Sequence, residues 1–225
     1  MKQILLISIL SLLCLSLQAQ DSVYCRANEW RSQIDEYYRK DSIAFPQKGS
    51  ILFVGSSSIR MWHNLQSYFP NHRVLARGFG GARMSDVLYH MQRLILDYKP
   101  SQIVLYAGEN DLANGVEATD LVDDIKCFVR IVELQLPGVP IIILSVKPSP
   151  YSAKIVKRQR DANRLLYAYS QTKPWVTFLD ISTLMFDAQG NYREELYRKD
   201  RLHITDEAYK LWQGIVEPHL INNLN

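Results

Sequence analysis

Cysteine is scarce in this chain, which has only Cys14, Cys25 and Cys127 among its 225 residues. Cys14 lies within an apolar N-terminal run, so two cysteines remain for the folded protein. These two could form one disulfide in an oxidising compartment or stay as free thiols. We expect two buried thiols, because Cys127 falls within an amphipathic helical pattern and Cys25 lies close to the start of the mature chain.

A strong excess of one charge is also missing. Lys and Arg total 26 against 23 Asp and Glu, which gives a formal net charge of +3. Proteins that attract nucleic acids or anionic membrane surfaces normally carry a much larger positive charge. We therefore expect no nucleic-acid partner and no membrane-surface role.

Only one long hydrophobic run occurs, at residues 4–17, and it follows the basic Lys2. The small residue Ala19 comes shortly after the run, and this arrangement is typical of a secretory signal peptide. A membrane anchor is the weaker interpretation, because the run is shorter than the ~20 residues that span a bilayer. We expect residues 1–20 to be a leader and the mature protein to be secreted or periplasmic.

After the leader, strand-like and helix-like patterns alternate. Short apolar runs that indicate buried parallel strands lie at residues 51–54, 73–76, 103–106, 141–145 and 176–180. Helical patterns follow at residues 87–98, 121–136 and 156–169, and after Thr205, whose hydroxyl can cap a helix. The alternation predicts an α/β fold, a doubly wound three-layer α/β/α sandwich. We expect one domain at residues 50–225, preceded by an N-terminal helix and linker at residues 21–49.

A Gly-Ser-Ser-Ser sequence at residues 55–58 directly follows the first strand. A hydroxyl at the start of a helix lies beside backbone amides that stabilise a developing negative charge, which favours a nucleophilic serine. A serine-rich helix cap is the competing interpretation, and three adjacent serines leave the nucleophile ambiguous. A phosphate-binding loop is disfavoured, because the pattern Gly-x-x-x-x-Gly-Lys is missing.

Asp200 and His203 are spaced so that their side chains can meet in a turn before the last helix. A histidine could accept the serine proton, and a carboxylate would hold its ring in the required tautomer. A surface salt bridge or two metal ligands would show the same spacing. We expect no zinc site, because no second pair of His or Cys residues accompanies these two.

Two further turns follow strands. Gly-Phe-Gly-Gly at residues 78–81 would let a backbone N–H approach a substrate with no Cβ in the way. Asn110, within Gly-Glu-Asn-Asp at residues 108–111, could donate a hydrogen bond to an oxyanion. Each turn is also ordinary loop chemistry. Because all four sequences are expected at one edge of the sheet, together they indicate a serine hydrolase.

These four blocks resemble those of the SGNH hydrolases, the GDSL-type esterases and lipases, over residues 51–220. Within that family the chain looks closest to platelet-activating-factor acetylhydrolase-like members. The resemblance implies a flavodoxin-like fold with a five-stranded parallel sheet, and it implies no cofactor and no metal.

The resemblance also implies roles for individual residues. Ser57 matches the nucleophile, and Asp200 and His203 match the rest of the triad. The oxyanion donors would be the backbone N–H groups of Ser57 and Gly81 and the side chain of Asn110. The chain departs from the family at Ser56, where an Asp is usual, but that position is not a triad member.

The expected substrate is an ester of a short acyl group, such as acetyl, on a larger alcohol such as a carbohydrate. No long apolar insertion is present that could form a lid or a deep acyl tunnel. Arg60, Phe79 and Arg83 are the candidates for substrate binding, and Lys147 follows the fourth strand at the same edge. Lysophospholipase or thioesterase activity, an acyltransferase on the same site and a non-catalytic carbohydrate-binding module are the alternatives.

Overall fold

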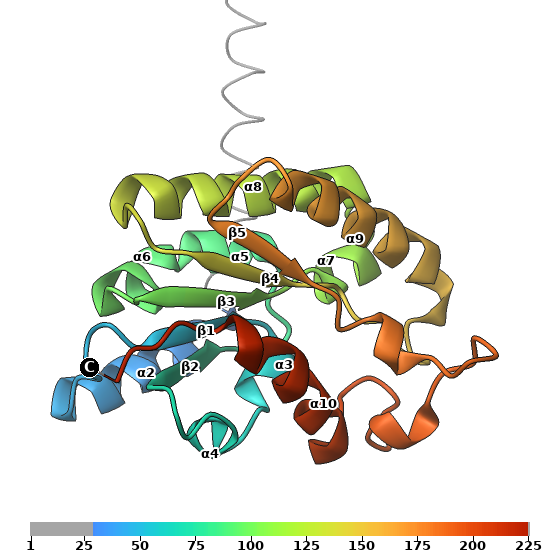
Figure 1. Ribbon diagram of the computed structural model, residues 1–225, viewed down its shortest axis with the longest axis horizontal. Coiled ribbons are helices and arrows are strands. Elements are labelled where there is room, and N and C mark those ends of the chain that lie inside the picture. Colours follow the sequence, from blue (N-terminus) through green and yellow to red (C-terminus); the bar gives the residue numbers. More distant parts are fainter. Residues whose placement is uncertain (1–28, 225) are drawn as a thin grey trace, which may run out of the picture.

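Five parallel strands form one sheet in the order β2-β1-β3-β4-β5 (Figure 1). The computed structural model describes residues 29–224 of the chain. The strands are β1 (Ile51–Gly55), β2 (Val74–Gly78), β3 (Gln102–Tyr106), β4 (Ile141–Leu144) and β5 (Val176–Leu179). The order and the parallel pairing confirm the predicted flavodoxin-like sheet.

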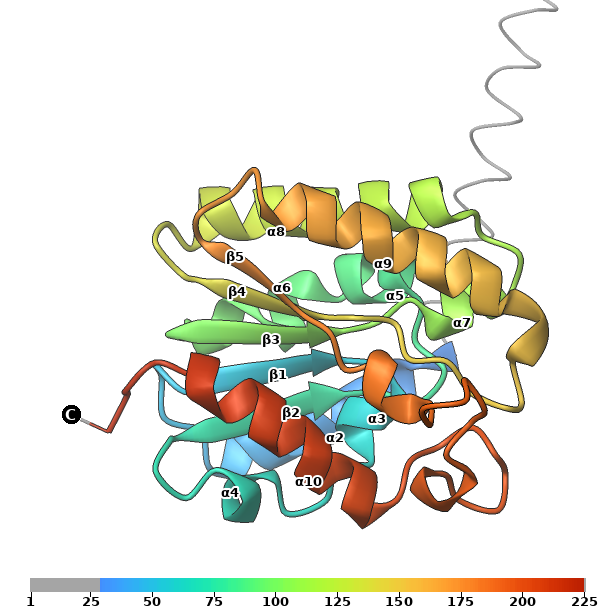
Figure 2. The ribbon, with the colours of Figure 1, turned by 45° about the vertical axis from the view of Figure 1, so that its right-hand side comes forward.

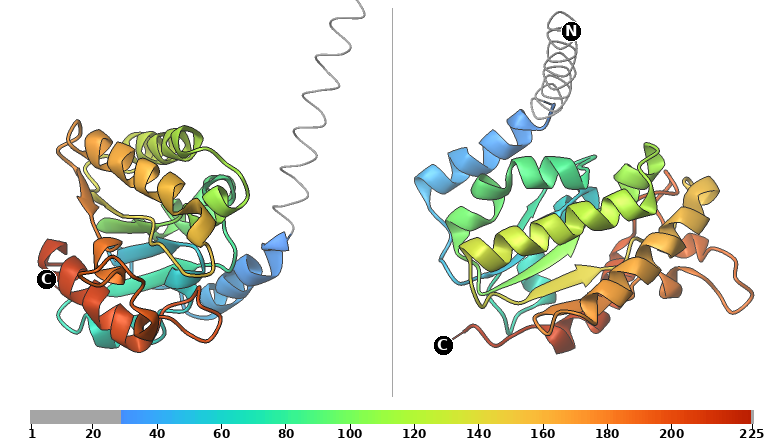
Figure 3. Two further views of the ribbon diagram at one scale, coloured as in Figure 1. Left: turned by 90° about the vertical axis from the view of Figure 1, so that its right-hand side faces the viewer. Right: turned by 90° about the horizontal axis from the view of Figure 1, so that it is seen from above.

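Helices cover both faces of the sheet and complete the predicted three layers (Figures 2 and 3). The α-helices are α2 (Arg31–Ile43), α3 (Ser57–Arg60), α4 (Leu65–Tyr68), α5 (Met84–Tyr89), α6 (Met91–Leu94), α7 (Glu109–Ala113), α8 (Ala118–Gln135), α9 (Val156–Ser170) and α10 (Asp206–Val216). Short 3₁₀ turns are η1 (Leu96–Tyr98), η2 (Ala153–Ile155), η3 (Thr183–Met185), η4 (Glu194–Leu196) and η5 (Glu217–His219). One core cluster contains side chains of α2, α5, α6, α8 and α9, and the other contains side chains of α3, α4 and α10.

Strand β1 shows how the sequence builds both cores. Leu52 and Val54 belong to the first cluster, whereas Ile51 and Phe53 belong to the second. Successive side chains of a strand point to opposite faces, so an unbroken apolar run is what a strand covered on both sides requires.

The register of the three neighbouring strands sets the position of the turns that follow them. Gly55 at the end of β1 pairs with Gly78 at the end of β2 and with Tyr106 at the end of β3. The three strands therefore end level with one another, and their turns lie along the same edge of the sheet.

The segment predicted as one helix at residues 87–98 forms α5, α6 and η1 instead. Its backbone leaves helical geometry at His90 and again at Ile95. Val87, Met91 and Leu94 are nevertheless buried. The spacing of apolar residues therefore predicted correctly which side chains face the core. It did not predict that the segment would consist of short helices instead of one continuous helix.

Cys127 is exposed on α8, so the prediction of a buried thiol is wrong for this residue. The apolar face of α8 turns Ile125 and Phe128 into the core and leaves Cys127 on the outer side. Cys25 and the predicted leader at residues 1–20 lie outside the described residues. Within residues 29–224, no helix combines the length and the apolar character needed to cross a bilayer.

A buried ion pair attaches the end of α2 to the edge strand β2. The Arg77 guanidinium lies 2.6 Å from Asp41 Oδ1, and the two side chains are only 8% and 10% exposed. Arg77 Nε also donates to the Tyr98 hydroxyl at 2.7 Å, and that hydroxyl donates to Asp41. The Arg77 guanidinium stacks on the rings of Tyr37 and Tyr98, each 4.7 Å away. These contacts make α2 part of the packed domain.

Removing one member of this cluster leaves the other charge buried without its partner. We expect Asp41→Ala to lower the free energy of unfolding by about 3–5 kcal/mol. The control is Asp123→Ala, which breaks a pair with Lys126 whose side chains are 70% and 46% exposed, and which we expect to cost less than about 1 kcal/mol. Urea unfolding measures both, and equal losses would contradict the assignment of Arg77–Asp41 as a structural pair.

Candidate active site

Three loops from neighbouring strands and one from the end of the sheet meet at the carboxyl edge. Ser57 follows β1, Gly81 follows β2 and Asn110 follows β3. Asp200 and His203 come from the loop between β5 and α10. The carboxyl edge of a parallel sheet is where ligands bind in folds of this class.

The turn after β1 depends on a glycine. Gly55 has a φ of +138°, and a Cβ at this position would lie 1.8 Å from the carbonyl oxygen of Tyr106. The close approach lets the Ser56 N–H donate to that carbonyl at 3.0 Å, continuing the pairing of the two strands into the turn. The chain then begins α3 at Ser57, so the sequence places this hydroxyl at the first position of a helix.

Ser57 is the serine of residues 56–58 that reaches the histidine. Its Oγ lies 3.0 Å from His203 Nε2. Ser56 and Ser58 are each only 3% exposed and lie beneath this surface. The structure thereby resolves which of the three adjacent hydroxyls is available.

A turn fixes the orientation of the histidine. Asp200 Oδ2 lies 2.7 Å from His203 Nδ1, while Asp200 Oδ1 accepts the backbone N–H groups of Leu202 and His203. Desolvation raises the pKa of Asp200, but the hydrogen bonds from the His203 ring and from these two backbone groups outweigh it and lower the pKa to about 2. The ionised carboxylate can only accept, so Nδ1 donates and the lone pair of a neutral imidazole at Nε2 faces Ser57 Oγ.

The three expected oxyanion donors belong to Ser57, Gly81 and Asn110, in the turns that follow β1, β2 and β3, which end level with one another. Among the described residues 29–224, the backbone N–H groups of Ser57 and Gly81 donate to no backbone carbonyl. Asn110 Nδ2 donates to the carbonyl of Ala82 at 2.9 Å, which holds its amide against the Gly81 loop. An amide nitrogen carries two hydrogens, so one remains available.

Asp111, which the sequence analysis did not single out, ties two of these loops together. Asp111 lies beside Asn110 in α7, and its Oδ1 accepts the backbone N–H of Met84 at 2.8 Å. Met84 begins α5, directly after the loop that contains Gly81. Burial raises the pKa of Asp111 to about 6. The residue follows Asn110 in the sequence, but a local motif does not reveal which distant N–H a carboxylate will accept.

Helix α2 packs directly on the Gly78–Gly81 loop, a second feature that the sequence analysis missed. Gln33 Oε1 accepts the Gly80 N–H at 3.0 Å, and the Tyr37 hydroxyl donates to the Gly78 carbonyl at 2.5 Å. The Trp30 ring lies so close that a Cβ on Gly81 would be 2.6 Å from Cη2. The spacing of Trp30, at the N-cap of α2, and of Gln33 and Tyr37 within α2 indicates that they share one helix face. It does not indicate which surface this face covers.

The predicted substrate-binding residues lie in different environments. Arg60 is exposed, and its guanidinium reaches over Gly80. Arg83 is half-buried at the start of α5. Phe79 is completely buried against Trp30 and His90, which contradicts a direct contact with substrate. Lys147 is only 1% exposed and is likewise unable to meet a substrate from solvent.

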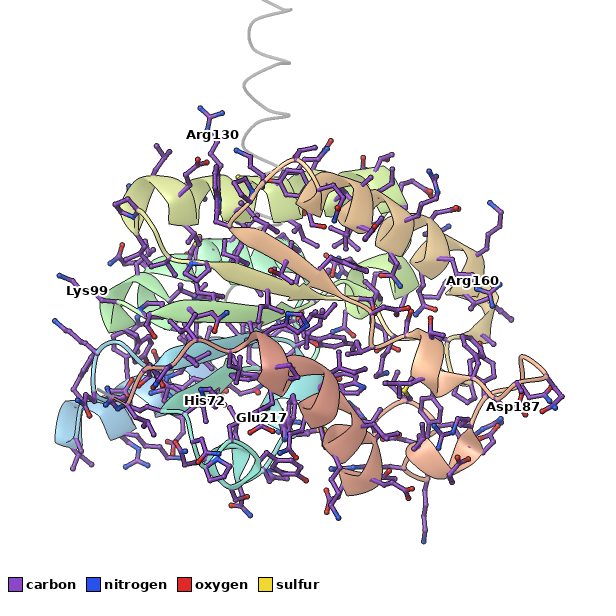
Figure 4. The ribbon with its side chains drawn as sticks, in the orientation of Figure 1. His72, Lys99, Arg130, Arg160, Asp187 and Glu217 are labelled. Carbon is purple, nitrogen blue, oxygen red and sulfur yellow. The ribbon has the colours of Figure 1, made fainter. Side chains whose placement is uncertain are left out.

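A cavity of about 440 Å³ opens between α9 and the segment at residues 182–190, where Arg160 and Asp187 are labelled in Figure 4. None of the lining residues is Ser57, Asp200 or His203. The Asn163 amide in its wall bonds both the N–H and the carbonyl of Val146. The Gln159 amide nitrogen donates to the Lys147 carbonyl. These amide groups therefore serve the fold.

Comparisons with known proteins agree with this architecture. The sequence model of the GDSL-like Lipase/Acylhydrolase family matches residues 41–211. The platelet-activating factor acetylhydrolase IB subunit alpha2 of Gallus gallus is 29% identical over 196 residues, which are 81% of this chain and 79% of that protein.

Solved structures share the fold at low sequence identity. A protein described as a platelet activating factor from Streptococcus pneumonia superimposes with a TM-score of 0.77 at 19% identity, covering 91% of this chain and 99% of that one. A GDSL-like lipase from Bacteroides thetaiotaomicron gives 0.69 at 18% identity, with 82% and 95% covered. An acetyl xylan esterase from Geobacillus stearothermophilus gives 0.63 at 12% identity, with 80% and 98% covered.

The family match extends from the end of α2 into α10 and contains every residue that the four sequence blocks contributed. It confirms the resemblance that these blocks indicated. The chain therefore belongs to the GDSL-like lipase/acylhydrolase family and is a carboxylic ester hydrolase.

Proposed function

We propose that Ser57, His203 and Asp200 act as a catalytic triad that hydrolyses esters through an acyl-enzyme. The observation that carries the proposal is the continuous chain from Ser57 Oγ to His203 Nε2 at 3.0 Å and from His203 Nδ1 to Asp200 Oδ2 at 2.7 Å. A nucleophile bonded to a base, with the base oriented by a carboxylate, is the arrangement that activates a serine hydroxyl.

In the first half-reaction, His203 Nε2 takes the proton of Ser57 while Oγ bonds to the ester carbonyl carbon. The carbonyl oxygen becomes an oxyanion that receives hydrogen bonds from the N–H groups of Ser57 and Gly81 and from Asn110 Nδ2. The carbon–oxygen bond to the alcohol then breaks, and the alcohol leaves with the proton from His203. Water repeats these steps on the acyl-enzyme and releases the acid.

We propose a short acyl group, such as acetyl, on a larger alcohol such as a carbohydrate. Support comes from the Gly78–Gly81 loop, which Trp30 and α2 cover closely, and from the shared fold of an acetyl xylan esterase. A lysophospholipase or thioesterase would need room for a longer chain or a different leaving group. An acyltransferase would use the same acyl-enzyme, and product analysis with and without acceptor sugars separates it from a hydrolase.

Secretion belongs to the same proposal. The basic start, the apolar run at residues 4–17 and the small residue after it are features of a leader. A polymer-bound ester outside the cell would be accessible to a secreted enzyme. N-terminal sequencing of the mature protein tests whether cleavage occurs near residue 20.

The nucleophile is tested with p-nitrophenyl acetate, butyrate and octanoate. We expect the mature protein to favour acetate and Ser57→Ala to abolish hydrolysis, because no other hydroxyl of residues 56–58 bonds His203. The control is Ser56→Ala, which removes a buried neighbouring hydroxyl and should remain active. Equal rates for Ser57→Ala and the unmodified protein would place the nucleophile elsewhere, and a preference for octanoate would contradict the acetyl assignment.

The oxyanion role of Asn110 has its own test. Removing one such donor lowers turnover by about 10²–10³, so we expect Asn110→Ala to lose kcat by that factor with little change in KM. Asn114→Ala is the control, because its exposed amide donates to the backbone carbonyl of Asn110 and not to the Ala82 carbonyl that the Asn110 amide bonds. Wild-type kcat in Asn110→Ala would remove this side chain from the mechanism.

The pH dependence separates the two ionisable members of the triad. Because the pKa of Asp200 is about 2, this carboxylate stays ionised in mild acid, and its stabilising contribution is lost only as the pH falls from ~4 toward 2. A proton on Nε2 prevents a histidine from accepting one from Ser57, so hydrolysis that depends on a histidine base falls in acid. We expect the hydrolysis rate to fall as the pH is lowered from about 8 to about 5, while circular dichroism shows an intact fold. A constant rate would contradict a catalytic histidine.

A further inference from the structure

A buried ion pair lies behind the candidate active site and takes no part in the mechanism above. Lys147 Nζ is 2.7 Å from Glu109 Oε2, and the two side chains are 1% and 9% exposed. Charged side chains are almost never this deeply buried unless they are paired and hydrogen-bonded. An apolar pair of similar size often stabilises a protein equally well, so stability alone does not account for two charges at this position.

The hydrogen bonds of Lys147 join two loops of the site. Besides Glu109, the ammonium donates to the carbonyl oxygen of Leu202 at 2.8 Å. Leu202 lies between Asp200 and His203, and Glu109 directly precedes Asn110. One ammonium therefore connects the loop that carries the acid and the base to the turn that carries the side-chain oxyanion donor.

The loop that carries Asp200 and His203 contains a strained residue and is held by hydrogen bonds from outside the turn. The backbone of Arg201 has a positive φ of 58°, in the left-handed region that non-glycine residues rarely adopt. The N–H of the next residue, Leu202, is held by Asp200, and its carbonyl is held by Lys147. The peptide groups around this strained turn are thus fixed from both sides.

Glu109 is itself held by two neutral hydroxyls. Tyr106 donates to its Oε2 at 3.3 Å, and Ser152 donates to its Oε1 at 3.4 Å. Burial raises the pKa of Tyr106 well above its ordinary value, so this hydroxyl remains a donor. The carboxylate therefore has a fixed position at the start of α7, one residue before Asn110.

We propose that Lys147 and Glu109 are positioning residues that set the location of the Asp200–His203 loop relative to the Asn110 turn. The proposal rests on the proposed function, in which these two loops act on the same substrate carbonyl. Neither side chain meets the substrate; the pair acts through the Leu202 carbonyl and through the backbone of the Asn110 turn. A shift of ~1 Å between catalytic groups can cost about 100-fold in rate.

The test compares Lys147→Met with the double variant Glu109→Met plus Lys147→Met. Kinetics with p-nitrophenyl acetate give kcat and KM, and urea unfolding gives stability. The single variant leaves a buried carboxylate alone and should lose stability, whereas the double variant should regain most of it because no unpaired charge remains. We expect kcat to fall about 10- to 100-fold in both variants, with KM nearly unchanged.

A purely structural pair gives a different pattern, in which kcat recovers together with stability in the double variant. That result would overturn the proposal, as would wild-type kcat in Lys147→Met. Lys126→Met is the matched control: it makes the same side-chain change at an exposed lysine of α8 that pairs with Asp123, and it should keep kcat. Should neither methionine variant fold, the double variant Glu109→Gln plus Lys147→Gln decides, because it removes both buried charges together and the shorter side chain at position 147 loses the bond to the Leu202 carbonyl. Wild-type kcat in that variant would again refute the proposal.

Failure of the proposed function is visible separately. An unmodified protein with no Ser57-dependent hydrolysis would overturn both the triad and the positioning role. An unmodified protein that hydrolyses the ester, beside Lys147 and Glu109 variants that do so equally well, would overturn the positioning role alone.

Discussion

The whole site depends on the register of β1 with β2 and β3, because this register makes the three strands end side by side. β1 lies between β2 and β3, and Gly55 pairs with Gly78 on one side and Tyr106 on the other. A shift of one residue in either pairing would turn the buried side chains of the strand to the wrong faces, so packing on both sides of the sheet enforces this register. The register in turn fixes where Ser57, Gly81 and Asn110 can lie.

Longer-range contacts hold these loops once the sheet has placed them. α2 braces the Gly78–Gly81 loop through Gln33 and Tyr37, and the Arg77–Asp41 pair attaches the end of α2 to β2. Behind the opposite side of the site, Lys147 bonds the loop that carries His203. Preorganised donors need no rearrangement as charge develops, and this is what makes them effective in stabilising an oxyanion.

Much of this could be predicted from the sequence, because the relevant signals are local. Apolar runs marked all five strands to within two residues, and Thr205 caps α10 as its hydroxyl suggested. The order of the four polar blocks along the chain indicated a shared edge, and the family resemblance selected Ser57 from three serines. The described geometry brings Ser57, His203 and Asp200 into one hydrogen-bonded chain.

Most of the features that escaped prediction depend on contacts between distant segments. The burial of Phe79 follows from α2 packing over its loop, and no periodicity in either segment indicates that contact. The exposure of Cys127 depends on which face of α8 meets the sheet. The Lys147–Glu109 pair joins residues 38 positions apart, and nothing around Lys147 in the sequence distinguishes it from a solvated surface lysine.

Covalent labelling distinguishes an activated Ser57 from an ordinary serine. The protein is treated with a fluorophosphonate, which reacts with a serine only when a base and an oxyanion hole activate it, and the adduct is located by peptide mass spectrometry. We expect a single adduct on Ser57 that disappears in His203→Ala. An adduct on another residue, or no adduct at all on the folded protein, would contradict it.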